Sequence, residues 1–159
     1  MENTIEFYKK TTIILFVLLL ITTGLLTKFV IKGFTKKTTD NRKEIVLLPE
    51  ERDVVLNEMR ILLKSVSDIS NSLSQNNFQE IGLTARATGT ARLRLISPAL
   101  MKKLPPELGN MALLVHKGFD ELADMVKDNK DPQLVNKKIG EITQTCVACH
   151  SIYKISAED

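Results

Sequence analysis

Several residue types are scarce in this chain of 159 residues. It has no Trp, only 5% aromatic residues, seven Gly and five Pro. Because a β fold with many tight turns depends on Gly and Pro, their shortage favours helices. The sequence also contains no Gly-rich phosphate loop, no HExxH zinc motif and no Ser-His-Asp arrangement. No acid–base pair for a substrate cleft is evident, and we expect a protein that is not an enzyme.

The formal net charge of +3 is divided unevenly along the chain. Residues 1–43 carry a net charge of +5, whereas residues 44–159 carry a net charge of −2. A nucleic-acid-binding domain concentrates basic residues on its folded surface. The mildly acidic body of the chain therefore argues against nucleic acid as a partner.

An apolar run near the N-terminus is long enough to cross a membrane. Its uncharged part extends from Thr11 to Thr27, and apolar residues resume at 29–31, after Lys28. A membrane-spanning helix needs about 20 apolar residues, and Lys28 can reach the interface by snorkelling. No Ala-x-Ala cleavage motif follows the run. We predict an uncleaved signal anchor at residues 1–34; a cleaved signal peptide and a buried helix are the alternatives.

Lysines flank the apolar run unequally. Lys9 and Lys10 precede it, and four lysines follow it at positions 28, 32, 36 and 37. By the positive-inside rule, this distribution alone keeps the C-terminal part in the cytoplasm. Residues 35–48 are predicted to be a linker, whose apolar end from Ile45 to Leu48 packs on the following domain or leads into its first helix.

Residues 49–159 are predicted to form one all-α domain, an antiparallel four-helix bundle. Apolar residues of the first helix recur by alternate steps of four and three, which is typical of a bundle seam. The last helix starts with Asp131 as N-cap and Pro132 in its first turn. The four predicted helices are residues 49–73, 77–95, 106–128 and 132–155, with a short helical turn at 98–103. Helices of this length with short connections favour a bundle.

Both cysteines of the chain and one of its two histidines lie near the end of the last helix, in the stretch CVACH. Cys146 and Cys149 continue the apolar stripe of that helix, so both thiols are expected to point inward. Cys-x-x-Cys-His is the pattern for covalent attachment of c-type haem. The two thiols add to the vinyl groups of the haem, and the imidazole of His150 binds the iron.

Three other interpretations of the motif stay open. A zinc site needs further ligands, and only His116 remains among the Cys and His residues. A redox dithiol normally opens a helix that follows a strand, whereas this motif ends the last helix. The third alternative is two buried thiols beside an uninvolved histidine. We predict one covalently bound haem c as the cofactor.

A CxxCH motif near the C-terminus of a four-helix bundle resembles the cytochrome c′ family, the class II c-type cytochromes. The resemblance covers about residues 49–155 and includes the Tyr and Lys after the motif. It implies thioether bonds to Cys146 and Cys149, His150 as the proximal iron ligand, and a homodimer. Because c-type haem is attached on the outer side of the bacterial cytoplasmic membrane, it also implies a single-pass protein with a periplasmic haem domain.

The residue on the other face of the iron decides between two functions in this family. A Met gives a six-coordinate electron carrier, and an apolar residue leaves a position open for NO or CO. Met59 lies on the seam of the first helix, whereas aligning Arg52 with a basic residue of the family selects Leu56. His116 is a third candidate, although its place at the edge of a stripe is more typical of a surface or boundary residue. Arg52 is also a candidate partner for a haem propionate.

Taken together, these patterns predict a membrane-anchored periplasmic cytochrome with one haem that transfers electrons between redox partner proteins. The predicted iron ligands are His150 and Met59. A five-coordinate haem protein that binds small gases, and a small haem subunit of a larger membrane redox complex, are the alternatives.

Overall fold

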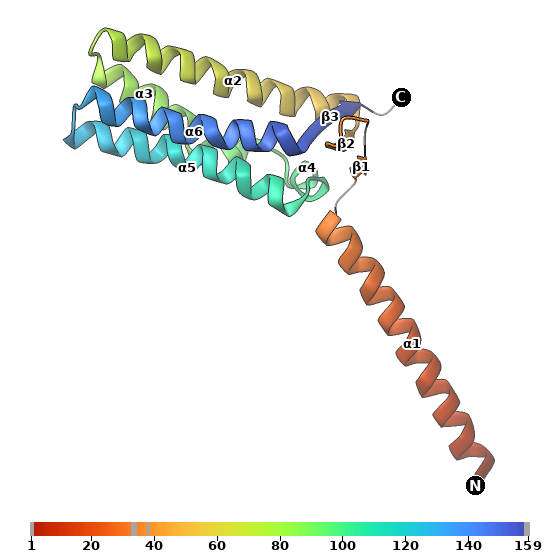
Figure 1. The fold of residues 1–159 in the computed structure, drawn as a ribbon. Coiled ribbons are helices and arrows are strands. Elements are labelled where there is room, and N and C mark those ends of the chain that lie inside the picture. The colour runs from red at the N-terminus through yellow and green to blue at the C-terminus, as the bar shows by residue number, and fades with distance from the viewer. Residues whose placement is uncertain (1, 33–34, 38, 158–159) are drawn as a thin grey trace. The chain divides into compact units, whose positions relative to one another are not determined.

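The chain forms an N-terminal helix and a second, mostly helical unit (Figure 1). This computed structural model describes the backbone of residues 2–32, 35–37 and 39–157 and the side chains of residues 6–27 and 39–157. The predicted boundary at residue 34 lies outside the described residues. The side chains of the lysines at 28, 32, 36 and 37, on which the orientation rule depends, also lie outside them.

The N-terminal helix α1 (Glu2–Lys32) is continuous and strongly apolar. Its stretch Glu6–Thr27 has a mean hydropathy of 2.0, and the large apolar side chains at 13–21 are all exposed. Within the described residues, it is the one helix long and apolar enough to cross a membrane. The predicted apolar N-terminal helix is thus confirmed, and it can serve as an anchor or as a signal sequence.

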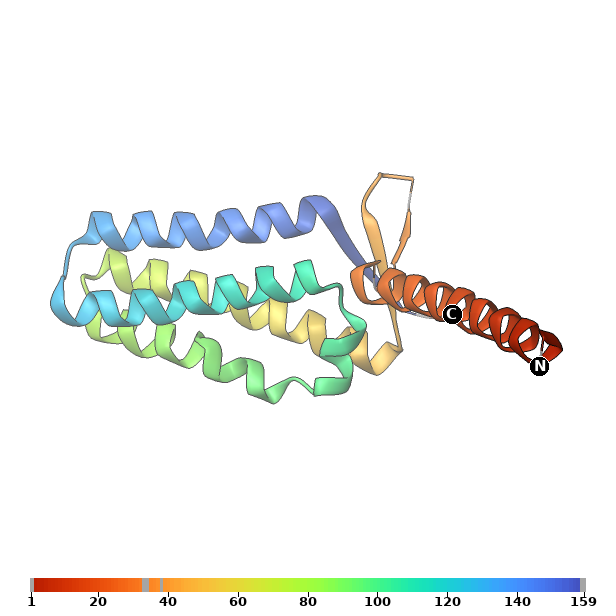
Figure 2. The same ribbon diagram turned by 90° about the horizontal axis from the view of Figure 1, so that it is seen from below.

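The second unit is built mainly from four helices that lie side by side and alternate in direction, as Figure 2 shows. Its elements are, in order, β1 (Thr35–Lys37), β2 (Lys43–Leu47), α2 (Pro49–Ser74), α3 (Phe78–Thr88), the 3₁₀-helix η1 (Thr90–Leu95), α4 (Pro98–Lys103), α5 (Pro106–Asp128), α6 (Pro132–Ile152) and β3 (Tyr153–Ala157). The long helices are α2, α3, α5 and α6. The prediction of a mostly helical chain is confirmed.

Helices begin where capping residues predict that they begin. Proline occupies the first turn of α2, α4, α5 and α6. The side chain of Asp131 accepts a hydrogen bond from the backbone N–H of Gln133 at 2.8 Å. Asn77 accepts one from Glu80 at 3.1 Å. These side chains satisfy amides that have no partner inside the helix.

The second predicted helix is shorter than expected. Helix α3 ends at Thr88, and the chain continues as η1 after Gly89. The backbone N–H and the hydroxyl of Thr90 both donate to Asp120 Oδ2 of α5, at 2.8 and 2.7 Å. Asp120 therefore takes the backbone N–H of Thr90, and the chain continues from there with 3₁₀ hydrogen bonds, such as the one from Arg92 to Gly89.

A small sheet occupies part of the predicted linker and the predicted end of the last helix. Strand β2 pairs in parallel with β3 and antiparallel with β1. Ile45 and Leu47 of β2 are 0% and 1% exposed and pack with Tyr153 and Leu100. Residues 43–47 therefore belong to the folded unit rather than to a linker. Helix α6 stops at Ile152 because the following residues pair with β2.

The core between the long helices is not equally tight on every side. Phe119 and Leu122 of α5 are fully buried with Ile69 of α2 and Ile81 of α3. A Cβ at Gly118 of α5 would lie 2.7 Å from Ile142 Cγ1, so α5 and α6 approach closely. By contrast, α2 and α6 are the most loosely packed pair of neighbouring long helices. The candidate site lies along this looser seam.

Candidate functional site

The motif residues lie on the last two turns of α6. Cys146 and Cys149 are half-buried free thiols, and His150 is exposed. The thiol of Cys146 donates to the carbonyl of Ile142, with 3.6 Å between Sγ and O. Helix geometry puts residues three and four apart on one face, so the two sulfurs and the imidazole of His150 are neighbours on α6.

The two thiols are poorly suited to dithiol redox chemistry. Burial raises the pKa of both, and for Cys149 the neighbouring Cys146 adds to the effect. A redox dithiol depends on a lowered pKa, which provides the thiolate nucleophile. Cys146 and Cys149 therefore stay protonated at neutral pH, which weakens the dithiol interpretation.

A cavity of about 120 Å³ lies between the motif, α2, α5 and the η1–α4 region. Both cysteines and both histidines of the chain border it, although His116 and Cys146 are far apart in sequence. Its walls are otherwise mainly apolar. They include Val55, Leu62, Leu93, Ile96, Leu104 and Leu108, together with Met59, Met101 and Met111. Sulfur atoms and imidazole rings that can bind a metal therefore border a cavity with mainly apolar walls.

Two further hollows, of about 140 and 390 Å³, adjoin this cavity. Met59 and His150 border all three spaces, and Leu56 borders the two outer ones. We call the three spaces together the α2–α6 groove. Pockets that hold cofactor-sized ligands usually measure about 300–1,000 Å³, so the groove matches such a ligand better than the cavity does alone.

The predicted basic residue Arg52 does not border the groove. Its guanidinium binds the neighbouring Asp53 with 2.9 Å between Nη2 and Oδ1. The hollow beside His150 is instead bordered by Arg42 and Lys154. The guanidinium of Arg42 binds Asp40 and also donates to the carbonyl of His150 at 3.4 Å. Positive charge therefore lies on the His150 side of the groove, but from other residues.

One carboxylate borders the cavity and carries its own counter-ion. Glu58 of α2 is 14% exposed and forms an ion pair with Arg92 of η1, which is 21% exposed. A charge beside apolar walls is stable only when it is paired and hydrogen-bonded. The pair also joins η1 to α2 at the cavity wall.

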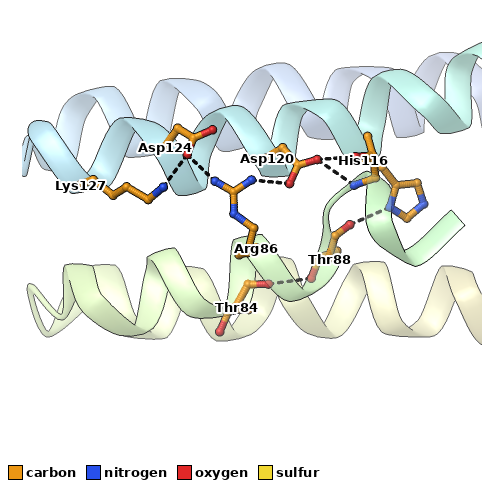
Figure 3. A network of polar contacts seen from close by, with 8 residues as sticks. Thr84, Arg86, Thr88, His116, Asp120, Asp124 and Lys127 are labelled. Atoms are coloured by element: carbon orange, nitrogen blue, oxygen red, sulfur yellow. Dashed lines mark hydrogen bonds and ion pairs between the residues drawn. The ribbon is translucent and has the colours of Figure 1, made fainter. Parts of the chain in front are cut away.

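His116 lies deeper than the sequence predicts. We expected a surface or boundary residue, but the side chain is only 1% exposed. Its Nδ1 lies 2.6 Å from the carbonyl oxygen of Thr88 (Figure 3). Because α3 ends at Thr88, that carbonyl has no partner within the helix. The sequence signal for this contact is Gly89. It ends the helix after Thr88, so the carbonyl of Thr88 needs a hydrogen-bond donor from elsewhere.

Zinc has weak support in this geometry. Within the described part of the chain, no three His, Cys, Asp or Glu side chains form a cluster that could hold one metal ion together. A structural zinc site needs four protein ligands.

The α2–α6 groove thus brings together Cys146, Cys149, His150 and Met59, four of the five predicted site residues, while Arg52 lies apart from it. Sequence reasoning missed the location of His116 and the basic residue Arg42. Comparison of the chain with models of protein families, with curated proteins and with solved structures found no match.

Proposed function

We propose that this chain is a membrane-anchored c-type cytochrome of the cytochrome c′ type, with one haem, that transfers electrons. The observation that carries the proposal is that Cys146, Cys149 and His150 of α6 border the same apolar groove as Met59 of α2. The sequence pattern alone requires only the three motif residues to be close together. Their position beside a groove of suitable size and lining adds independent support.

The residues present fit a covalently held haem. Cys146 and Cys149 would hold it through thioether bonds, and His150 would bind the iron. Both thiols are free and half-buried, as this attachment requires. Arg42 and Lys154 would offer positive charge to the haem propionates, in place of the predicted Arg52. When bound, the haem supplies a one-electron Fe(III)/Fe(II) couple.

The residues around the groove would favour electron transfer over other haem chemistry. Met59 is the proposed sixth ligand, and His/Met ligation raises the reduction potential. Filling the sixth position keeps external ligands away from the metal. The apolar walls exclude water and lower the local dielectric, which controls the potential further.

A gas-binding haem protein is the second candidate. Leu56 borders the two outer hollows of the groove and could cover an open iron position. Met59 borders all three spaces, including the cavity that contains both cysteines. The wider contact of Met59 with the groove favours the electron carrier.

The anchor and its orientation form part of the proposal. An uncleaved α1 would hold the domain at the bacterial cytoplasmic membrane, near its redox partner proteins, and covalent haem attachment would put the domain in the periplasm. The lysines that follow the span argue for the opposite orientation. The motif is the more specific of the two signals. An anchored domain of this kind could also be a subunit of a larger membrane redox complex.

Absorption spectroscopy of the reduced full-length chain in detergent tests this function. We expect a low-spin, six-coordinate spectrum that carbon monoxide does not change. A high-spin, five-coordinate spectrum with rapid carbon monoxide binding would support the gas-binding function instead. Met59→Leu should change this spectrum. The control is Met125→Leu, because Met125 packs against the main core and borders none of the three spaces of the groove, and it should leave the spectrum unchanged.

A further inference from the structure

The hydrogen bond of His116 determines which ring nitrogen carries the proton. Nδ1 lies 2.6 Å from the backbone carbonyl of Thr88. A carbonyl oxygen only accepts, so Nδ1 must be the donor. In the neutral ring, Nε2 then carries a lone pair and no proton.

The position of this ring is firmly held. The hydroxyl of Thr88 bonds with Ser65 Oγ at 2.8 Å and donates to the carbonyl of Thr84 at 2.8 Å. Asp120, one turn after His116 in α5, binds Arg86 as well as Thr90, as Figure 3 shows in part. Contacts on three helices therefore fix both the carbonyl and the helix that carries the ring.

The second ring nitrogen has no partner among the side chains that the structure describes. Among the described residues, none donates a hydrogen bond to Nε2, which points away from Thr88 in Figure 3. No fully buried side-chain nitrogen or oxygen in the described residues lacks a partner. Nε2 must therefore border open space, and His116 borders the cavity that also contains Cys146, Cys149 and His150.

An accessible imidazole lone pair on a residue that borders an apolar cavity is suited to binding a metal ion. An unsatisfied acceptor in such a place destabilises the fold. Histidines that bind metals usually donate their other N–H to a backbone carbonyl or a carboxylate, which orients the ring. Satisfying the carbonyl of Thr88 explains the burial of His116 but gives no role to Nε2.

We propose that Nε2 of His116 is a second protein ligand for the iron, which takes the sixth position when Met59 does not. This inference rests on the proposed function. Its consequence is that losing Met59 changes the ligand without opening the iron to gases. The chain would then remain an electron carrier with His/His ligation and a lower reduction potential than with His/Met ligation.

Three variants of the full-length, haem-loaded chain test the proposal: Met59→Ala, His116→Gln and the double variant. We expect Met59→Ala to stay low-spin, to show a lowered potential and not to bind carbon monoxide. The double variant should become high-spin and bind carbon monoxide, whereas the matched double variant Met59→Ala/Met125→Leu should stay low-spin. The free energy of unfolding of His116→Gln alone measures the structural cost of that substitution. A high-spin, carbon-monoxide-binding Met59→Ala variant would overturn the proposal.

A second measurement needs no substitution in the groove. The chain has only two histidines, so ¹⁵N NMR of the reduced chain can resolve the ring of His116. We expect a protonated Nδ1 and an unprotonated Nε2, whereas a proton on Nε2 would overturn the proposal. The outcomes are separable, because absence of covalent haem in the parent chain contradicts the proposed function itself, while a high-spin Met59→Ala variant contradicts only the role of His116.

Discussion

Asp120 is a single side chain on which a local change of structure depends. It accepts from the N–H and the hydroxyl of Thr90, and Arg86 binds its other oxygen at 2.7 Å. It thereby joins the start of η1 and the end of α3 to α5. The carbonyl of Thr88, in the same turn, binds the ring of His116. The contacts of Asp120 therefore also help to fix the position of His116, the proposed iron ligand.

Replacing Gly89 tests how tightly this turn is packed. A Cβ at Gly89 would overlap the carboxylate of Asp120, so the carboxylate would have to leave Thr90. We expect Gly89→Ala to lower the free energy of unfolding by about 1–3 kcal/mol, measured by denaturant unfolding in detergent. The control is Gly140→Ala in α6, where a Cβ meets nothing within 4 Å. That change should instead stabilise the helix by about 0.5–1 kcal/mol, and equal effects of both changes would contradict this account.

The carboxylate of Asp120 should make stability depend on pH in a defined direction. Burial alone would raise its pKa, but hydrogen bonds from Thr90 and Arg86 outweigh burial and hold the pKa below its usual value. A lowered folded-state pKa stabilises the fold above the unfolded-state pKa of about 3.9. That stabilisation is lost as the pH falls through the folded-state pKa.

Asp120→Asn removes this contribution. We expect the variant to be less stable than the parent by about 1–3 kcal/mol at neutral pH. The difference should shrink as the pH falls below about 4, in denaturant unfolding at a series of pH values. Asp128→Asn, at the exposed end of α5, is the control and should change stability by less than about 0.5 kcal/mol. A difference that grew in acid would contradict the assignment.

At the residue scale, the short CVACH motif was a better guide to candidate site residues than the periodicity of apolar residues. The sequence pattern was enough to choose Cys146, Cys149 and His150 as candidates, and the seam position of Met59 was enough to expect it at the groove. The place of His116 could not be predicted, since it depends on a carbonyl left without a partner where α3 ends. Arg52 was chosen by resemblance to a family, whereas its contact with Asp53 is a local property of this chain.

At the scale of elements, the β2–β3 pair ties the segment before α2 to the end of α6. The ring of Tyr153 packs under the ammonium of Lys43, 5.3 Å from its centre, and its hydroxyl donates to Glu107 at 2.6 Å. Because Tyr153 lies three residues after His150, the strand pair holds the motif end of α6 in place. We therefore expect the stability of the sheet and that of the site to be coupled.

Truncating Ile45 tests whether β2 belongs to the folded unit. Its side chain is fully buried, so Ile45→Ala should lower the free energy of unfolding by about 2–5 kcal/mol. Val54→Ala is the control, because Val54 is 45% exposed on α2, and its effect should stay within about 0.5 kcal/mol. Circular dichroism during denaturation measures both. Equal, small effects would mean that residues 43–47 act as a linker after all.

Helices were easier to predict than strands for a physical reason. The starts of α2, α5 and α6 depend on residues within one turn, so proline and Asp131 were sufficient signals. The pairing of β2 with β3 joins residues more than 100 positions apart, and local periodicity carries no information about it. A short apolar run such as Ile45–Leu47 is also ambiguous between a helix start and a strand.

At the scale of the whole molecule, α1 can serve as an anchor or as a signal sequence, and the two roles predict different products. We predict that the full-length chain sediments with the membrane fraction and is released by detergent but not by alkaline carbonate. Mass spectrometry of the intact protein should show that residues 6–27 are retained. A soluble product that lacks them would mean that α1 is a signal sequence and that the carrier diffuses freely.

Covalent haem attachment is the central claim, and intact-protein mass spectrometry tests it most directly. The full-length chain is produced in a bacterial host that has the c-type cytochrome assembly machinery, and thiol alkylation is measured on the same sample. We predict a mass gain of one haem per chain and no alkylation of Cys146 or Cys149. The mass gain should be lost in the Cys146→Ala/Cys149→Ala variant, which has no thiol left to hold the haem. A parent chain with the mass of the bare polypeptide and two alkylated cysteines would contradict the account.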